Sequence, residues 1–179
     1  MAAAQRGRLL HALFERLPSL PPEGRAAAGE RWLERSGGVD DAADRAALVR
    51  DVCTIIADPA HAAIFAPHAL AEAPIAAVLA DGTVVAGTVD RLLVEHDRIF
   101  LVDFKTGRRA PADLAGVPGH HLRQMGAYAA ALAAIFPDRP VEAALLYTSG
   151  PTLIPLTSDL LAAHKPGLGG AEQMLELDG

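Results

Sequence analysis

The chain has 179 residues, a length that suggests one domain with a sizeable hydrophobic core. Hydrophobic residues make up 51% of the sequence, which excludes a disordered chain, and the net charge of −6 argues against a domain that holds nucleic acid on a broad basic surface. The single cysteine excludes an internal disulfide and an iron–sulfur cluster held by four cysteines in this chain. With no secretion signal and no run of 18 apolar residues, we expect a cytoplasmic protein without a membrane span.

Three helices are expected before the first strand. Apolar residues at helical spacing predict helices over residues 2–17, 23–36 and 41–57. In the first of these, His11 borders the apolar stripe, so its imidazole is expected to face at least partly inward. A hydrogen bond to the backbone or a metal ion would satisfy it there.

A strand is expected over residues 75–79, with Asp81-Gly82 as the hairpin turn that follows it. Glu72 precedes this strand in the predicted arrangement. Its side chain is either an exposed loop acid or a further carboxylate near the charged residues of the next hairpin.

The most informative stretch is residues 87–109, in which two apolar runs flank His96-Asp97. This pattern predicts two strands joined by a two-residue turn. With Glu95 opposite Arg98, facing residues have numbers that sum to 193. The register of the hairpin therefore follows from the sequence alone.

In this register Asp90 lies opposite Asp103, and Lys105 shares their face because side chains alternate along a strand. Facing carboxylates about 5 Å apart repel each other unless a cation lies between them. A divalent metal ion with oxygen ligands meets that need. The alternative is that Asp90 pairs with Arg91 and Asp103 with Lys105, as solvated charges at strand ends.

A loop and a helix follow the hairpin. Four basic residues around this loop form a candidate phosphate-binding patch, although ordinary solvated side chains are the alternative: Lys105, Arg108, Arg109 and Arg123. The helix is expected over residues 119–136, and its apolar stripe is expected to pack on the sheet. A separate face carries His121, Gln124 and Tyr128, which either contact a nucleotide, orient metal ligands or form amphipathic surface.

Together these motifs resemble the RecB-type nuclease domain of the PD-(D/E)XK superfamily, as it occurs in the AddA-type helicase–nucleases of bacterial double-strand break repair. The resemblance rests on GTVDRL, on LVDFKTG, on the Q-x-x-x-Y helix and on a leading RLLHALF helix that ends in L-P. It extends from about residue 6 to 156. It implies that the chain is the nuclease domain of a larger ATP-dependent DNA helicase, whose motor is absent here because the chain has no P-loop motif.

The expected fold is α/β, with a restriction-endonuclease-like core and a helical N-terminal segment. A central mixed sheet of about five strands, completed by strands near 141–147 and 153–156, is flanked by helices on both faces. We expect a single domain over residues 1–179. Its expected parts are a helical segment, a nuclease core of sheet and helix, and a C-terminal tail: 1–66, 67–156 and 157–179.

The resemblance also implies a set of site residues. The implied metal ligands are three side chains and one main-chain carbonyl: His11, Asp90, Asp103 and Phe104. The implied catalytic residues are Asp90, Asp103, Lys105 and Glu72, of which Lys105 would position or polarise the attacking water. The residues expected to contact the substrate are Gln124, Tyr128, Arg108 and Arg123.

The implied activity is that of a Mg²⁺-dependent deoxyribonuclease with exonuclease character, acting in double-strand break repair and recombination, with Mn²⁺ able to substitute for Mg²⁺. Its partners would be DNA, an AddB-type subunit and the helicase portion of the parent protein. The alternative is a catalytically silent module of the same complex that binds DNA ends or is purely structural. The complete set of His, Asp, Asp and Lys residues favours the nuclease.

Overall fold

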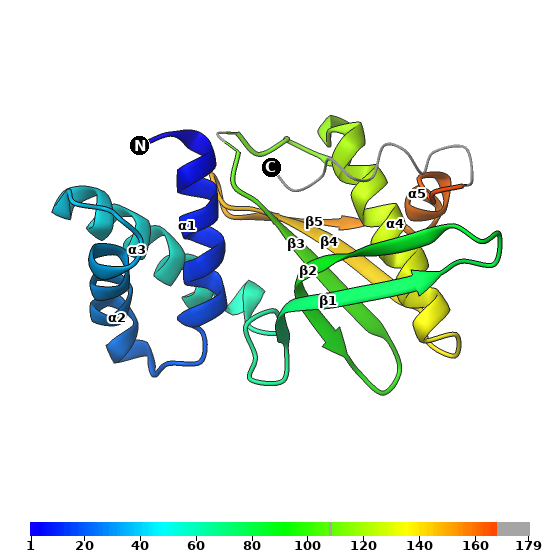
Figure 1. Cartoon of the computed structure of the whole chain (residues 1–179), viewed down its shortest axis with the longest axis horizontal. Helices are drawn as coiled ribbons and strands as arrows, with labels where there is room; N and C mark the ends of the chain where they lie inside the picture. Colours follow the sequence, from blue (N-terminus) through cyan, green and yellow to red (C-terminus); the bar gives the residue numbers. More distant parts are fainter. Residues whose placement is uncertain (108, 168–179) are drawn as a thin grey trace.

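The computed structural model describes residues 1–107 and 109–167 of the chain. Five α-helices and five strands lie in this part of the sequence, with two short 3-10 helices between them (Figure 1). In chain order the elements are α1 (Ala3–Arg16), α2 (Pro22–Arg35), α3 (Ala42–Ala57), η1 (Pro59–His61), β1 (Leu70–Val78), β2 (Val84–Val94), β3 (Ile99–Lys105), η2 (Leu114–Gly116), α4 (Gly119–Ile135), β4 (Val141–Tyr147), β5 (Thr152–Leu156) and α5 (Ser158–Ala163).

The strands form one mixed sheet in the order β1-β2-β3-β4-β5. Strands β3 and β4 are parallel, and each of the other neighbouring pairs is antiparallel. Helix α4 makes the crossover between the two parallel strands, because such strands cannot be joined by a tight turn. The α/β fold with a five-stranded mixed sheet, expected from the sequence, is confirmed.

Helices cover both faces of the sheet, as Figure 1 shows for α1 to α3 on one side and α4 and α5 on the other. Val102, Phe104 and Leu146 belong to the apolar core that the sheet shares with the N-terminal helices. Leu101 and Leu145 belong to the core beneath α4. The middle strands therefore separate two apolar layers. No helix in residues 1–107 or 109–167 is long and apolar enough to cross a membrane.

The N-terminal helices form for local reasons that the sequence shows. Leu10, Leu13 and Phe14 make the buried stripe of α1. The side chain of Asp41 caps α3 by accepting a hydrogen bond of 2.8 Å from the N–H of Asp44. The apolar stripe packs α1 against the sheet, and α1 carries His11.

The first strand is longer than the sequence predicts. Instead of residues 75–79 it occupies Leu70–Val78, and its first half is rich in alanine and contains Pro74. Such residues have little intrinsic preference for a strand, so backbone pairing with β2 decides the conformation. The Asp81-Gly82 turn is confirmed, with Gly82 at a positive φ of 88°.

Candidate functional site

The predicted register of the central hairpin is confirmed. The paired residues of β2 and β3 run from Arg91 opposite Val102 to Val94 opposite Ile99. Each pair has numbers that sum to 193, because the two-residue turn fixes which residues face each other. The regular pairing ends there, one position before the two aspartates.

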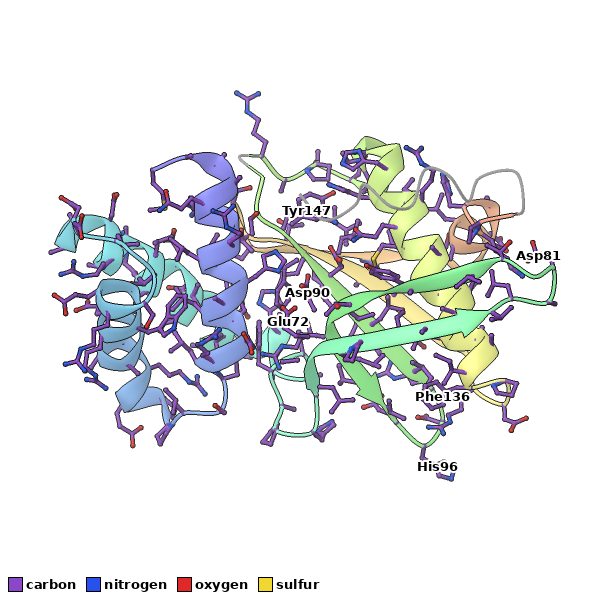
Figure 2. The ribbon with its side chains drawn as sticks, viewed as in Figure 1. Glu72, Asp81, Asp90, His96, Phe136 and Tyr147 are labelled. Carbon is purple, nitrogen blue, oxygen red and sulfur yellow. The ribbon has the colours of Figure 1, made fainter. Side chains whose placement is uncertain are left out.

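Asp90 occupies this position, level with Asp103 in the register, and both side chains are buried. The Oδ2 atom of Asp90 accepts a hydrogen bond of 2.5 Å from the main-chain N–H of Phe104. Its Oδ1 atom lies 2.9 Å from Nδ1 of His11 on α1. Figure 2 shows Asp90 between α1 and the sheet. One carboxylate therefore connects β2 to both β3 and the first helix.

The regular alternation of side chains fails at this point of β2. Val89 and Leu92 both belong to the core beneath α4, although an odd number of positions separates them. Asp90 and its neighbour Arg91 both contact α1, so the alternation changes between these two residues. Asp103, on the regular strand β3, instead has its ion-pair partner on the α4 side.

That partner is Lys105, whose Nζ atom lies 2.7 Å from Oδ2 of Asp103. The same ammonium donates a hydrogen bond of 2.6 Å to Oε1 of Gln124 on α4. With two acceptors in place, the lysine side chain is largely buried and held at the end of β3. The two aspartates are therefore level in register, but their contacts lead to different helical layers.

Three polar residues on one face of α4 meet three neighbouring strands. His121 Nδ1 lies 3.0 Å from the hydroxyl of Tyr147 on β4, and Gln124 contacts β3. A side-chain carbon at Gly87 on β2 would lie 2.7 Å from the ring of Tyr128, so the glycine makes room for that ring. This face was expected to be separate from the sheet-packing stripe, and that expectation is wrong. The spacing is right, but the face turns toward the sheet.

Glu72 lies inside β1, not before the first strand as predicted. It stands level with Asp90 in the register of β1 and β2, at a position where the paired backbone is interrupted. Its φ of 47° lies in the left-handed region, which costs a non-glycine residue about 1–3 kcal/mol. Ligand atoms of His11, Glu72 and Asp90 all lie within 4.8 Å of one another. The strained residue therefore adds a second carboxylate beside His11.

In the metal-free chain, three groups at the site have raised pKa values and therefore stay protonated to higher pH than usual. Burial alone would lower the pKa of His11, but its hydrogen bond with Asp90 and the charges of Asp90, Asp103 and Glu72 outweigh this, and its pKa is raised. Burial, and then the charge of Asp90, raises the pKa of Glu72. Burial and Asp90 also raise the pKa of Asp103 to about 6, although Lys105 opposes them. The negative charge of Asp90 contributes to all three shifts.

Two residues on the α4 side, His121 and Tyr147, also have shifted pKa values. Burial, followed by the positive charge of Lys105, lowers the pKa of His121 to about 4, so this imidazole is neutral at neutral pH. Burial and then the charge of Asp103 raise the pKa of Tyr147. Tyr147 was not identified from the sequence. The parallel register of β3 and β4, which places it beside Lys105, is visible only in the folded chain.

The basic residues predicted around the loop are not equivalent. Lys105 turns inward to Asp103, whereas Arg109 and Arg123 are exposed. Arg108 lies outside the described residues. Of the predicted substrate-contacting residues, Gln124 and Tyr128 therefore line the interior beneath α4, and Arg123 lies at its surface.

The donors at this point of the sheet fit a divalent cation. An imidazole and two carboxylates lie within 4.8 Å of one another, close to the span of opposite ligands around a single divalent ion, which is about 4–5 Å. Oxygen ligands suit Mg²⁺, and Mn²⁺ also accepts an imidazole. Asp103 lies outside this group of three, and its carboxylate forms an ion pair with Lys105.

Comparisons with known proteins gave a family match and a similar solved structure. The family model described as the PD-(D/E)XK nuclease superfamily matches residues 1–172. Among solved structures, the chain is similar to the one described as "Crystal structure of SSO0001", with 14% identity, a TM-score of 0.35, and 88% of this chain and 81% of that chain covered. No curated protein matches the chain.

The buried acid Asp103 leads to a prediction about the metal-free protein. Its pKa is about 6 in the folded chain against 3.8 as the ordinary value, so its ionisation destabilises the fold as the pH rises through this range. We expect Asp103→Asn to stabilise the metal-free protein by about 1–3 kcal/mol at pH 7.5 and by little at pH 4. Urea unfolding in a chelating buffer at the two pH values measures this difference. An equal effect at both pH values would contradict it.

The backbone of Glu72 leads to a second prediction. Replacing it by glycine or by alanine removes the same carboxylate, but only glycine adopts a positive φ without strain. We expect Glu72→Gly to unfold at higher urea concentration than Glu72→Ala, with a free-energy difference of about 0.5–1 kcal/mol. If alanine were the more stable of the two, the residue would not be strained in solution.

Proposed function

The chain belongs to the PD-(D/E)XK nuclease superfamily, and from this premise we propose that it hydrolyses DNA phosphodiesters with a divalent metal ion held beside His11 and Asp90. The observation that carries the proposal is the gathering of His11, Glu72 and Asp90 next to the buried Asp103–Lys105 pair. The buried carboxylates of Asp90 and Asp103 are costly to keep charged without a cation, and the raised pKa of Asp103 shows that cost.

The proposed metal ligands are His11, Asp90 and Asp103, with the main-chain carbonyl of Phe104. Glu72 is proposed as a further acidic ligand, directly or through water, since its carboxylate lies within 4.8 Å of the ligand atoms of His11 and Asp90. For Asp103 to bind the ion, its carboxylate has to share its charge between the ion and Lys105. Mg²⁺ is the proposed ion, and Mn²⁺ is the proposed substitute.

Lys105 is proposed to act on the scissile phosphate and the attacking water. Its ammonium is already fixed by two acceptors, so no rearrangement is needed before it stabilises charge that develops on the phosphoryl oxygens. Gln124 holds Lys105 from α4, whereas Tyr128 on the same helix face is buried beside Gly87 of β2. When bound, the ion supplies a Lewis acid and a more acidic water.

A narrower proposal places the chain in an AddAB- or RecBCD-type helicase–nuclease that acts in double-strand break repair and recombination. Its support is the resemblance of GTVDRL, LVDFKTG and the Q-x-x-x-Y helix to the RecB-type domain. The acidic net charge of −6 supports it further, because a domain without a broad basic surface gains from a motor that delivers the DNA. In this setting the proposed partners are the helicase portion of the parent protein and an AddB-type subunit, and the proposed activity is that of an exonuclease.

The two lysines of the sequence provide a matched test of the catalytic proposal. We expect Lys105→Ala to lower Mg²⁺-dependent cleavage of linear DNA by about 1000-fold or more, because the variant loses charge stabilisation in the transition state. The control, Lys165→Ala, changes an exposed lysine just after α5 and should cleave at the rate of the unmodified chain. Single-turnover cleavage of single- and double-stranded oligonucleotides, with circular dichroism to check folding, measures both.

Undiminished cleavage by Lys105→Ala would remove the catalytic assignment. Binding of Mn²⁺ and of DNA ends by the unmodified chain without any cleavage would favour the silent end-binding module instead. Cleavage of a small phosphodiester with no preference for DNA would point to a phosphodiesterase of small nucleotides.

A further inference from the structure

Arg91, the residue after Asp90, is a buried arginine that the catalytic proposal does not use. It is 4% exposed and lies on the α1 side of the sheet. Its Nη2 donates a hydrogen bond to the main-chain carbonyl of Phe14, and its Nη1 donates one of 3.4 Å to the carbonyl of Ala69. The guanidinium also lies over the ring of Phe65, 5.4 Å from its centroid.

Both acceptors lie close in sequence to residues of the acidic group. Phe14 is three residues after His11 on α1, and Ala69 is three residues before Glu72, just outside β1. The carbonyl of Phe14 lies in the last turn of α1, where carbonyls lack partners within the helix and favour a cation. The arginine therefore ties the helix that carries His11 and the strand that carries Glu72 to β2, which carries Asp90.

Stability alone gives a poor account of this arginine. Burying a guanidinium is costly, and no hydrogen-bond partner for its Nε atom is found among the described residues. Its direct partners are neutral carbonyls, and the nearby negative charges that compensate it are those of Asp90 and Glu72, with Glu15 on α1. The side chain and the acidic group thus depend on each other.

We propose that Arg91 is a positioning residue that holds α1 and the start of β1 on β2, and so sets the spacing of His11, Glu72 and Asp90 for one divalent ion. The inference rests on the metal site of the proposed function and extends it to a residue that touches neither metal nor substrate. A rigid support is needed because the three donors come from three separate elements. Without the arginine, α1 keeps its apolar packing and the contact of His11 with Asp90, but loses the hydrogen bond that Phe14 accepts from β2.

Isothermal titration of the whole chain with Mn²⁺ tests the inference apart from catalysis. We expect Arg91→Met to bind Mn²⁺ about 10–100-fold more weakly, the range typical of residues that support metal ligands. Arg91→Lys keeps the charge but offers one compact donor group, so it should still lose about tenfold. The control is Arg98→Met, which removes a surface arginine paired with Glu95 and Glu142 at the hairpin turn and should leave the affinity unchanged.

A positioning role and a purely electrostatic role predict opposite changes in Mn²⁺ affinity. An arginine that acted only by its charge would repel the ion, so Arg91→Met would then bind Mn²⁺ more tightly. Equal or tighter binding by a folded variant overturns the inference. If Arg91→Met does not fold, Arg91→Lys decides in the same way.

A DNA-cleavage assay on the same proteins distinguishes failure of this inference from failure of the proposed function. Suppose that the unmodified chain binds Mn²⁺, that the Arg91 variants bind it more weakly, and that none of these proteins cleaves DNA. This result would refute the nuclease and leave the positioning role intact. Absence of Mn²⁺ binding by the unmodified chain would overturn both.

Discussion

The site depends on the carboxylate of Asp90, which joins three elements that are distant in sequence. One oxygen lies beside the imidazole of His11 on α1, and the other accepts the N–H of Phe104 on β3. The carboxylate accepts this hydrogen bond at the point where the regular main-chain pairing of β2 and β3 ends. The same carboxylate thus lies at the break in the pairing of β2 and β3 and at the contact of α1 with the sheet. The ligand atoms of His11 and Glu72 lie within 4.8 Å of it.

Three destabilising features gather around this centre in an otherwise well-packed fold. Glu72 has a strained backbone, Asp103 is an acid with a pKa of about 6, and Arg91 is a buried cation with an unsatisfied donor. Their gathering at one point supports the proposal of a divalent-cation site there. In the metal-free chain, burial and then the charge of Asp90 raise the pKa of Glu72 and of Asp103, and the neighbouring acids raise the pKa of His11 against the effect of its burial.

The hairpin and the helices could be read from the sequence because local rules determine them. A two-residue turn fixes the register around Asp90, and helical spacing places Gln124 and Tyr128 on one face. The strand that holds Glu72 could not be read in the same way, because its alanine-rich first half becomes a strand only by pairing with β2. The role of Arg91 was equally hidden, since its partners are main-chain carbonyls that any sequence would supply.

The central claim is that the acidic group beside α1 is a binding site for one divalent cation. Anomalous diffraction from crystals soaked in Mn²⁺ tests it most directly. The account predicts a single strong peak in contact with His11 and Asp90, with Glu72 or Asp103 completing the ligands. A saturating soak that gives no peak there, or a peak at a site that excludes both His11 and Asp90, would contradict it.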